Sequence, residues 1–152
     1  MRLLRGGCRC GASRFELSDV MDAGYCHCSQ CRRRSGGPMF AFVTVKDLDF
    51  QLTMGGVLSE PSETTGTRQY CEKCRNEISL NYDNPEFGKL RAIGIGLLDQ
   101  PELVRPTYHQ FVAYMLPWLD IRDTLPRFQG NEITHPRDRL SPFPDKAEGC
   151  LD

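Results

Sequence analysis

The 152-residue chain has no apolar run that approaches the ~20 residues a helix needs to cross a bilayer. It also has no excess of charge of either sign, because 19 Lys and Arg residues stand against 20 Asp and Glu residues, for a formal net charge of −1. These absences argue against a membrane partner and against nucleic acid, which would need a basic field. We therefore expect a soluble, cytoplasmic protein, and the sequence is compatible with a homo-oligomer.

Apolar and aromatic residues are also scarce. Apolar residues make up 39% of the chain and aromatic residues 9%, with a single tryptophan. A chain of this length ordinarily folds as one domain and buries roughly 68–70% of its unfolded surface. Because few residues are apolar, we expect a small hydrophobic core. Metal cross-links would add stability beyond what the packing of this core provides.

Cysteine, by contrast, is abundant. Seven of the eight cysteines fall into three tight clusters, Cys8-Arg9-Cys10, Cys26-His27-Cys28-Ser29-Gln30-Cys31 and Cys71-Glu72-Lys73-Cys74. In a reducing compartment, closely spaced cysteines are more often metal ligands or redox centres than disulfides. Disulfides remain an alternative, although Cys-x-Cys is an awkward spacing for a bridge between its own members. Cys150 stands alone and is expected to be a bystander thiol.

Short segments with alternating apolar and polar residues predict an all-β fold. The candidate strands are residues 14–17, 39–45, 46–52, 67–70, 77–82 and 92–98. Glycine and proline punctuate the chain at the short spacing typical of such domains. No amphipathic helix longer than about two turns is evident, and a brief one between Leu103 and Leu116 would be interrupted by Pro106.

The chain changes character from Leu125 onward, where four of the ten prolines lie among charged residues. We expect a zinc-binding domain over residues 1–128 and an extended, proline-rich tail over residues 129–152. His135, in that tail, is expected to be solvated. Trp118, between Pro117 and Leu119, is expected to lie in the core.

Two of the cysteine pairs fit one closed four-thiolate site. Zinc–thiolate bonds of about 2.3 Å in a tetrahedron put neighbouring sulfurs roughly 3.8 Å apart. The Cys71–Cys74 turn meets that separation readily, and the extended Cys8–Cys10 pair presents both side chains on one face. We therefore expect these four residues to hold a structural zinc ion, worth roughly 10–16 kcal/mol of apparent binding free energy at neutral pH.

The remaining trio, Cys26, Cys28 and Cys31, is one ligand short of a closed shell. Three thiolates on zinc leave the fourth place for water or a substrate, as catalytic zinc sites generally do. Three interpretations stay open: an exchangeable site, a closed site completed by His27, His109 or an acidic side chain, and a metal-free centre for thiol redox chemistry. His27 alternates with its neighbours and is expected to face away from the metal.

Residues near the trio supply candidate substrate-binding and catalytic groups. Arg32, Arg33, Arg34 and Ser35 follow directly. Guanidinium groups would offset the −1 charge of a three-thiolate zinc site or bind a substrate carboxylate through paired hydrogen bonds. Arg32 is the strongest candidate, Arg33 and Ser35 are further substrate-binding candidates, and Arg33 or Arg34 could equally be solvated. His109 could move a proton near neutral pH or be a hydrogen-bonded core histidine.

These motifs resemble the family of glutathione-dependent formaldehyde-activating enzymes, which includes centromere protein V. The resemblance covers about residues 5–128 and is carried by Gly-Gly-Cys8-Arg-Cys10-Gly11, Cys26-His27-Cys28-Ser-Gln-Cys31-Arg32-Arg-Arg-Ser35-Gly36 and Thr67-Arg68-Gln-Tyr70-Cys71-Glu-Lys-Cys74. It implies folded-over antiparallel sheets, a zinc-ribbon-like β-tent stapled by zinc. It also implies a structural ion on the four-cysteine set and a catalytic-type ion on the trio. The family usually has glycine directly after the last of these cysteines, where this chain has Arg75, and we expect Asn76 to take the left-handed conformation.

The activity that the resemblance implies is the condensation of formaldehyde with glutathione to S-hydroxymethylglutathione, a carbon–sulfur lyase reaction. We therefore expect two zinc ions per chain and a substrate that is an adduct of glutathione, or another thiol, with formaldehyde or a related small aldehyde. Arg32 and His109 are the candidate catalytic residues. A non-catalytic zinc-binding interaction module and a thiol oxidoreductase are the alternatives.

Overall fold

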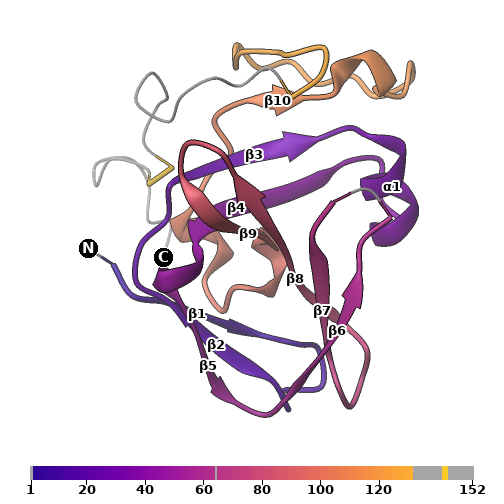
Figure 1. Ribbon diagram of the computed structural model, residues 1–152. Helices are drawn as coiled ribbons and strands as arrows, with labels where there is room; N and C mark the ends of the chain where they lie inside the picture. Colours follow the sequence, from indigo (N-terminus) through magenta and orange to yellow (C-terminus); the bar gives the residue numbers. More distant parts are fainter. Residues whose placement is uncertain (1, 64, 132–141, 144–152) are drawn as a thin grey trace, which may run out of the picture.

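The computed structural model describes residues 2–63, 65–131 and 142–143, whose strands form two folded-over antiparallel sheets (Figure 1). A three-stranded sheet has the order β1-β2-β5, and a seven-stranded sheet has the order β10-β3-β4-β9-β8-β7-β6. The strands are β1 (Leu4–Gly7), β2 (Arg14–Leu17), β3 (Asp22–Cys26), β4 (Phe40–Lys46), β5 (Phe50–Met54), β6 (Val57–Pro61), β7 (Thr67–Cys71), β8 (Glu77–Asn84), β9 (Gly88–Gly94) and β10 (His109–Gln110). The all-β expectation is therefore confirmed.

The two sheets are joined where the chain passes directly from one to the other. β4 ends at Lys46, the turn η1 (Asp47–Asp49) follows, and β5 continues in the smaller sheet. A second junction lies beyond β9, where Gly6 of β1 forms an isolated antiparallel bridge with Leu98. A Cβ on Gly6 would lie 2.5 Å from the Leu97 carbonyl oxygen, so this close approach of backbones requires glycine.

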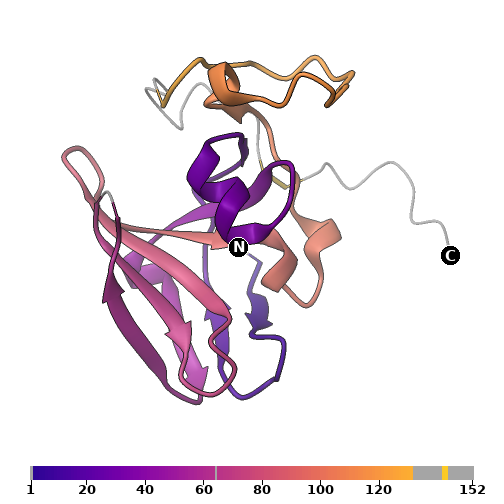
Figure 2. The ribbon, with the colours of Figure 1, turned by 90° about the vertical axis from the view of Figure 1, so that its right-hand side faces the viewer.

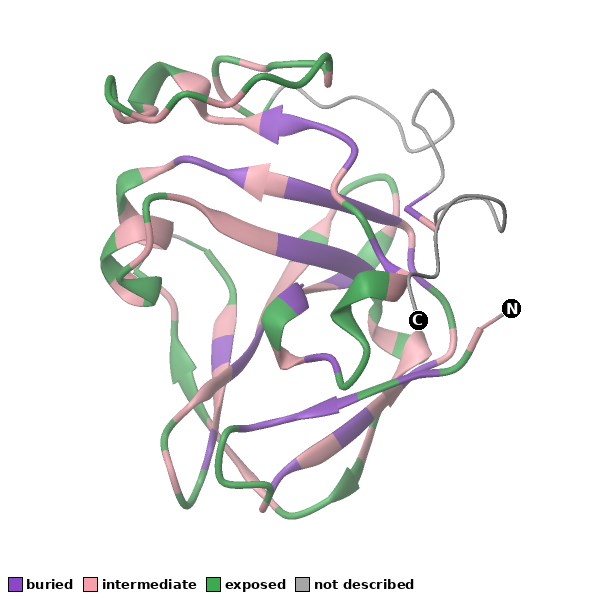
Figure 3. Ribbon diagram, turned by 180° about the vertical axis from the view of Figure 1, so that it is seen from behind, coloured by how far each residue is buried: buried purple, intermediate pink, exposed green. Residues whose placement is uncertain are grey.

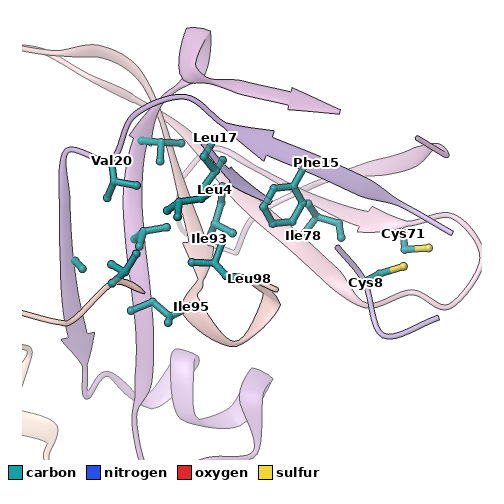
Figure 4. Close-up of a cluster of buried hydrophobic side chains, with 14 residues drawn as sticks. Leu4, Cys8, Phe15, Leu17, Val20, Cys71, Ile78, Ile93, Ile95 and Leu98 are labelled. Atoms are coloured by element: carbon teal, nitrogen blue, oxygen red, sulfur yellow. The ribbon is translucent and has the colours of Figure 1, made fainter. Parts of the chain in front are cut away.

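The main hydrophobic core lies between the sheets. Its buried side chains come from both of them and include Phe15 and Leu17 of β2, Val43 of β4, Ile78 of β8 and Ile93 of β9. Figure 3 shows the buried segments concentrated in the central strands. The cluster extends to Cys8 and Cys71, which lie at its edge beyond Phe15 and Ile78 (Figure 4). Two of the clustered cysteines are therefore part of the core itself.

The α-helix α1 (Ser29–Ser35) has two turns and connects β3 to β4. It begins at Cys28, whose sulfur accepts a hydrogen bond from the Cys31 backbone N–H, and it ends at Gly36, which has a φ of 72°. A left-handed glycine after a helix is a common C-cap because glycine has no Cβ to clash. The helix therefore starts inside the second cysteine cluster.

Residues 109–131 form a layer beside β3, seen at the top of Figure 2. β10 pairs with β3 in parallel, and the Phe128 N–H donates to the His109 carbonyl oxygen at 2.9 Å. The Phe111 N–H likewise donates to the Gly130 carbonyl oxygen at 3.0 Å. The start of the expected tail is thus hydrogen-bonded to the segment that follows β10.

Several sequence predictions need correction. Residues 46–52 do not form one strand, because η1 interrupts the alternation before β5 begins. Residues 92–98 leave the strand after Gly94 and enter the 3₁₀ turn η2 (Ile95–Leu97). No α-helix forms between Leu103 and Leu116; the described elements there are the end of η3 (Pro101–Leu103), β10 and η4 (Val112–Tyr114). The apolar alternation of these segments does not report burial, because Leu48 in η1 is 81% exposed and a 3₁₀ turn brings every third side chain, not every second, to the same face.

Trp118 was expected in the core, and this is wrong: its exposure is 69%. Its flanking residues Pro117 and Leu119 belong to the outer layer rather than to a strand. Among the described residues, no helix has the length and hydropathy that crossing a membrane requires. Cys150, His135 and most of residues 129–152 lie outside the described residues.

Candidate metal centres and the adjoining pocket

Cys8, Cys10, Cys71 and Cys74 bring four sulfur atoms within 4.8 Å of one another, and we refer to them as the four-thiol cluster. The Cys8 and Cys10 sulfurs are 3.4 Å apart, and those of Cys10 and Cys71 are 3.9 Å apart. These distances bracket the roughly 3.8 Å expected between thiolates on one tetrahedral ion. The loop after β1 and the turn after β7 therefore meet as the two halves of one candidate metal site.

Backbone N–H groups point at the sulfurs of the four-thiol cluster. The Ser13 N–H donates to the Cys8 sulfur at 3.3 Å, and the Cys74 N–H donates to the Cys71 sulfur at 3.5 Å. The hydrogen bond from Cys74 is the main cause that lowers the pKa of Cys71, to about 6. Hydrogen bonds that favour the thiolate also favour metal ligation, because the thiolate is the ligand form.

The turn of the third motif uses a residue that the sequence analysis did not choose. Arg75 has a φ of 62°, so it occupies the left-handed region itself, and the expectation that Asn76 would do so is wrong. Asn76 has another role, because its side-chain oxygen accepts a hydrogen bond from the Arg9 N–H at 3.0 Å. This hydrogen bond joins the Cys8–Cys10 loop to the Cys71–Cys74 turn, in addition to the contacts between the sulfurs.

Cys26, Cys28 and Cys31 form the second group, the three-thiol cluster, whose sulfurs also lie within 4.8 Å of one another. Cys26 is the last residue of β3, Cys28 is the N-cap of α1, and Cys31 lies in the first turn of the helix. The whole cluster thus comes from six consecutive residues, whose strand-to-helix turn places the three side chains together. The described cysteines of both clusters form no disulfide.

Within the three-thiol cluster the surroundings favour the thiolate form of Cys28. Hydrogen bonds from Cys26 and then Cys31, with backbone N–H donors, lower the pKa of Cys28 to about 2. The same contacts with Cys28 and Cys31, together with burial, raise the pKa of Cys26. Three adjacent sulfurs, with hydrogen bonds that favour the thiolate at Cys28, are the donor set that a soft or borderline divalent ion prefers.

Within the described part of the chain, no fourth protein ligand completes the three-thiol cluster. Among the described residues, no histidine nitrogen or carboxylate oxygen joins the three sulfurs within the 4.8 Å limit. Two of the residues considered for that role, His27 and His109, hydrogen-bond to each other instead, at 2.9 Å between His27 Nε2 and His109 Nδ1. Both clusters could therefore hold metal ions, and they differ in the number of ligands that the protein supplies.

Of the three consecutive arginines, Arg34 is the one that reaches the sulfurs. Its Nη2 lies 3.6 Å from the Cys31 sulfur, and its Nη1 donates to Glu77 at 2.6 Å. Glu77 also accepts from Arg68 at 2.9 Å, and Arg68 is only 2% exposed. Arg32 is partly buried, and its Nε has no hydrogen-bond partner within the described structure, whereas Arg33 and Ser35 are exposed.

Next to β3, His27, His109 and Asp123 form a chain of hydrogen bonds. His109 Nε2 is 2.8 Å from Asp123 Oδ2, and His27 is bonded to the other nitrogen of His109. The bond from His109 holds the pKa of Asp123 below its ordinary value against the opposing effect of burial. Burial, followed by the charge of His109, lowers the pKa of His27 to about 4. The ionised Asp123 thus accepts the His109 Nε2–H, and the other nitrogen of His109 shares a hydrogen bond with His27.

A pocket of about 660 Å³ opens beside the three-thiol cluster, and all three of these cysteines line it. This volume lies in the range typical of small-molecule sites. Phe42 of β4 and Tyr108 form part of the wall, and the Tyr108 hydroxyl donates to Asp22 at 2.9 Å. A Cβ on Gly24 would lie 2.5 Å from the Tyr108 ring, so glycine in β3 allows this ring to occupy the wall. His27 and His109 are fully buried and are not part of the lining.

Sequence reasoning missed the roles of Arg34, Glu77 and Asp123. Arg34 could have been found from the helix period, since a residue three positions after Cys31 lies on the same face of α1. Glu77 and Asp123 carry no comparable local signal, because each meets its partner only through the tertiary fold.

Comparisons with known proteins were made by structure, by sequence and by family model. A crystal structure of a Rhodobacter sphaeroides protein is similar to this chain, with a TM-score of 0.49 and 19% sequence identity. The alignment covers 82% of this chain and 98% of the Rhodobacter chain. A search among curated proteins gives no match. The family model described as glutathione-dependent formaldehyde-activating enzyme matches residues 3–114, which include all seven clustered cysteines. The chain therefore belongs to the family of glutathione-dependent formaldehyde-activating enzymes.

Proposed function

We propose that this protein is a zinc-dependent carbon–sulfur lyase that interconverts a thiol and a small aldehyde with their adduct. The thiol is glutathione or a relative of it, and the aldehyde is formaldehyde or a related small aldehyde. Family membership supports the reaction class, and the cysteine clusters support the metal. In this proposal the four-thiol cluster holds a structural zinc ion and the three-thiol cluster holds the second.

The observation that carries the proposal is the position of the three-thiol cluster. Three sulfurs with no further described protein ligand line the wall of a substrate-sized pocket. Zinc bound there would supply Lewis acidity and lower the pKa of a thiol brought next to it. A closed four-thiolate site offers no such place, which is why we assign the chemistry to the three-thiol cluster.

The reaction balances without an oxidant or reductant. The sulfur of the thiol attacks the aldehyde carbon, a carbon–sulfur bond forms, and the carbonyl π electrons move to the oxygen. The proton lost by the thiol ends on that oxygen, which gives a hemithioacetal. In the opposite direction the carbon–sulfur bond breaks and the two substrates are released.

The surrounding residues have supporting roles in this proposal. Arg34, held by Glu77, places positive charge 3.6 Å from the Cys31 sulfur and offsets the charge of the cluster. We assign Arg32, Arg33 and Ser35 on α1 to the carboxylate groups of the thiol substrate. His109 acts as a positioning residue, because it is fully buried and its hydrogen bonds fix the strand that ends at Cys26.

The test is exchange NMR with ¹³C-formaldehyde and glutathione, which measures the rate of adduct formation and breakdown at equilibrium. The zinc-loaded protein is expected to raise this rate well above the uncatalysed one. The Cys28→Ser variant is the matched comparison, because serine is a good N-cap and retains the hydrogen bond that starts α1. Exchange that is equally fast with wild type, with Cys28→Ser and without protein would refute the proposal and favour a non-catalytic zinc module.

A further inference from the structure

The pocket beside the three-thiol cluster is much larger and more apolar than formaldehyde requires. Formaldehyde contributes one carbon and one oxygen, whereas the pocket has about 660 Å³. Its wall includes the side chains of Phe42, Tyr82, Phe87, Tyr108 and Phe111. Aromatic side chains of this kind recognise another ring through stacked or edge-to-face contacts. Phe42 and Tyr108 already form such an edge contact, with centroids 6.2 Å apart.

The two arginines that line this pocket are already paired with carboxylates. Arg34 and Arg68 both donate to Glu77, and Arg68 also donates to Glu63 at 3.3 Å. Glutathione carries two carboxylates and an ammonium group, and each would need a partner after leaving water. Breaking the Arg–Glu contacts would leave buried charges unpaired, which is costly. The aromatic pocket therefore suits an apolar substituent better than the charged ends of a tripeptide.

A second hollow, of about 500 Å³, adjoins the aromatic pocket at the Arg34–Glu77 ion pair. The two hollows share Cys31, Arg34 and Glu77 as lining residues. The second one is also lined by Ser35 and by Asn76, and it therefore offers polar groups near the same sulfur. A molecule whose sulfur lies at Cys31 can extend a polar part into the second hollow and an apolar part into the first.

We propose that the site takes the glutathione-type adduct of an aldehyde with an aromatic or aralkyl side chain, with the ring in the aromatic pocket and the polar thiol carrier in the second hollow. This inference rests on the proposed function and deepens it by naming the aldehyde class. The step is unchanged: R–SH adds to R′–CHO, the carbon–sulfur bond forms, and the proton moves to the carbonyl oxygen, where R′ now carries the ring.

Binding of two unreactive thioethers tests this inference separately from catalysis. S-benzylglutathione and S-methylglutathione differ in the ring alone, and isothermal titration calorimetry with the zinc-loaded protein measures both dissociation constants. The S-benzyl compound is expected to bind at least about tenfold more tightly, a difference of about 1.4 kcal/mol. Equal affinities would overturn the aromatic assignment. If wild type nevertheless accelerated formaldehyde–glutathione exchange, the proposed function would stand.

Substitution of an aromatic lining residue tests whether the benzyl ring of the ligand lies in the aromatic pocket. Phe87→Ala, which removes one pocket wall near the tip of the β8–β9 hairpin, is expected to reduce the S-benzyl preference roughly threefold to tenfold. Trp118→Ala is the matched control, because Trp118 is an exposed aromatic residue outside both linings. It should leave the ratio of the two dissociation constants unchanged. An equal loss of preference in both variants, or none in Phe87→Ala, would contradict the placement.

Catalysis gives the second readout. Exchange NMR compares phenylacetaldehyde with formaldehyde at equal glutathione concentration, and the expected kcat/KM is at least about tenfold higher for phenylacetaldehyde. A preference for formaldehyde would overturn the inference and leave the lyase intact. Acceleration of neither reaction would refute the proposed function together with the inference.

Discussion

The two cysteine clusters differ in where their ligands come from. The four-thiol cluster joins a loop near the start of the chain to the turn between β7 and β8, and two of its cysteines are buried in the main core. The three-thiol cluster comes from six consecutive residues at one end of β3 and lies on a pocket wall. Sequence separation therefore distinguishes a group that can hold the fold together from one that is free to take part in chemistry.

The clusters are connected by a short chain of contacts. Glu77 follows the Cys71–Cys74 turn and accepts hydrogen bonds from Arg34, whose other nitrogen lies 3.6 Å from the Cys31 sulfur. The turn that closes the four-thiol cluster thereby positions a cation at the three-thiol cluster. The Arg34–Glu77 ion pair thus lies between the two clusters.

The largest effect is expected from substituting the last cysteine of each cluster. Cys74→Ser removes a ligand from the four-thiol cluster, whose zinc would contribute roughly 10–16 kcal/mol, as much as the net stability of a domain. We expect this variant to be unfolded in far-UV circular dichroism. Cys31→Ser should retain the wild-type β signal, melt within about 4 °C of wild type, bind one zinc ion fewer and lose exchange activity. Equal melting temperatures for the two variants would remove the distinction between the clusters.

A smaller effect is expected from breaking the Arg34–Glu77 ion pair between the two clusters. Glu77→Gln removes the charge that pairs two partly or fully buried arginines, which should lower the free energy of unfolding by about 3 kcal/mol. Urea denaturation measures this change. Asp120→Asn is the control, because it breaks the exposed pair with Arg122, and no measurable change is expected there. A stability loss of the same size in both variants would show that burial of the pair does not matter.

Much of the architecture could be predicted from sequence, and the reasons lie in particular residues. The strict alternation of Arg14–Leu17 matched β2, and the spacing of the cysteines indicated which ones could share a metal ion. Strand β3 was missed, because Asp22–Cys26 is buried at nearly every position and shows no alternation.

The site was harder to anticipate. The partnership of Arg34 with Glu77 and that of His109 with Asp123 depend on contacts between residues 43 and 14 positions apart. The pocket gathers aromatic side chains from β4, from β8 and its following turn, and from the residues on either side of β10, and no single segment of sequence carries that pattern. Local motifs therefore predicted which cysteines lie together, and tertiary structure was needed for their surroundings.

Breaking the hydrogen bond between His109 and Asp123 should loosen the strands next to the three-thiol cluster more than the strands next to the four-thiol cluster. Asp123→Ala leaves a buried His109 N–H without its acceptor, which should cost about 1–3 kcal/mol. Hydrogen exchange is expected to be faster in β3 and β10 than in wild type and unchanged in β7 and β8. Uniformly faster exchange in all four strands would argue against a local positioning role for His109.

The smallest effect is expected from Trp118→Ala. The residue is exposed and outside both pockets, so the free energy of unfolding should change by no more than about 0.5 kcal/mol. Thermal melting checks this. A large destabilisation would mean that this aromatic side chain contributes to the fold after all.

Stepwise removal of zinc tests the division between the clusters most directly. Zinc release to a chelator is followed with a zinc-sensitive dye, while circular dichroism reports the fold and exchange NMR reports activity on the same samples. The first equivalent should leave quickly, abolish exchange and preserve the β signal, and the second should leave only as the protein unfolds. Release of both equivalents in one phase with unfolding, or activity that survives the first release, would contradict the account.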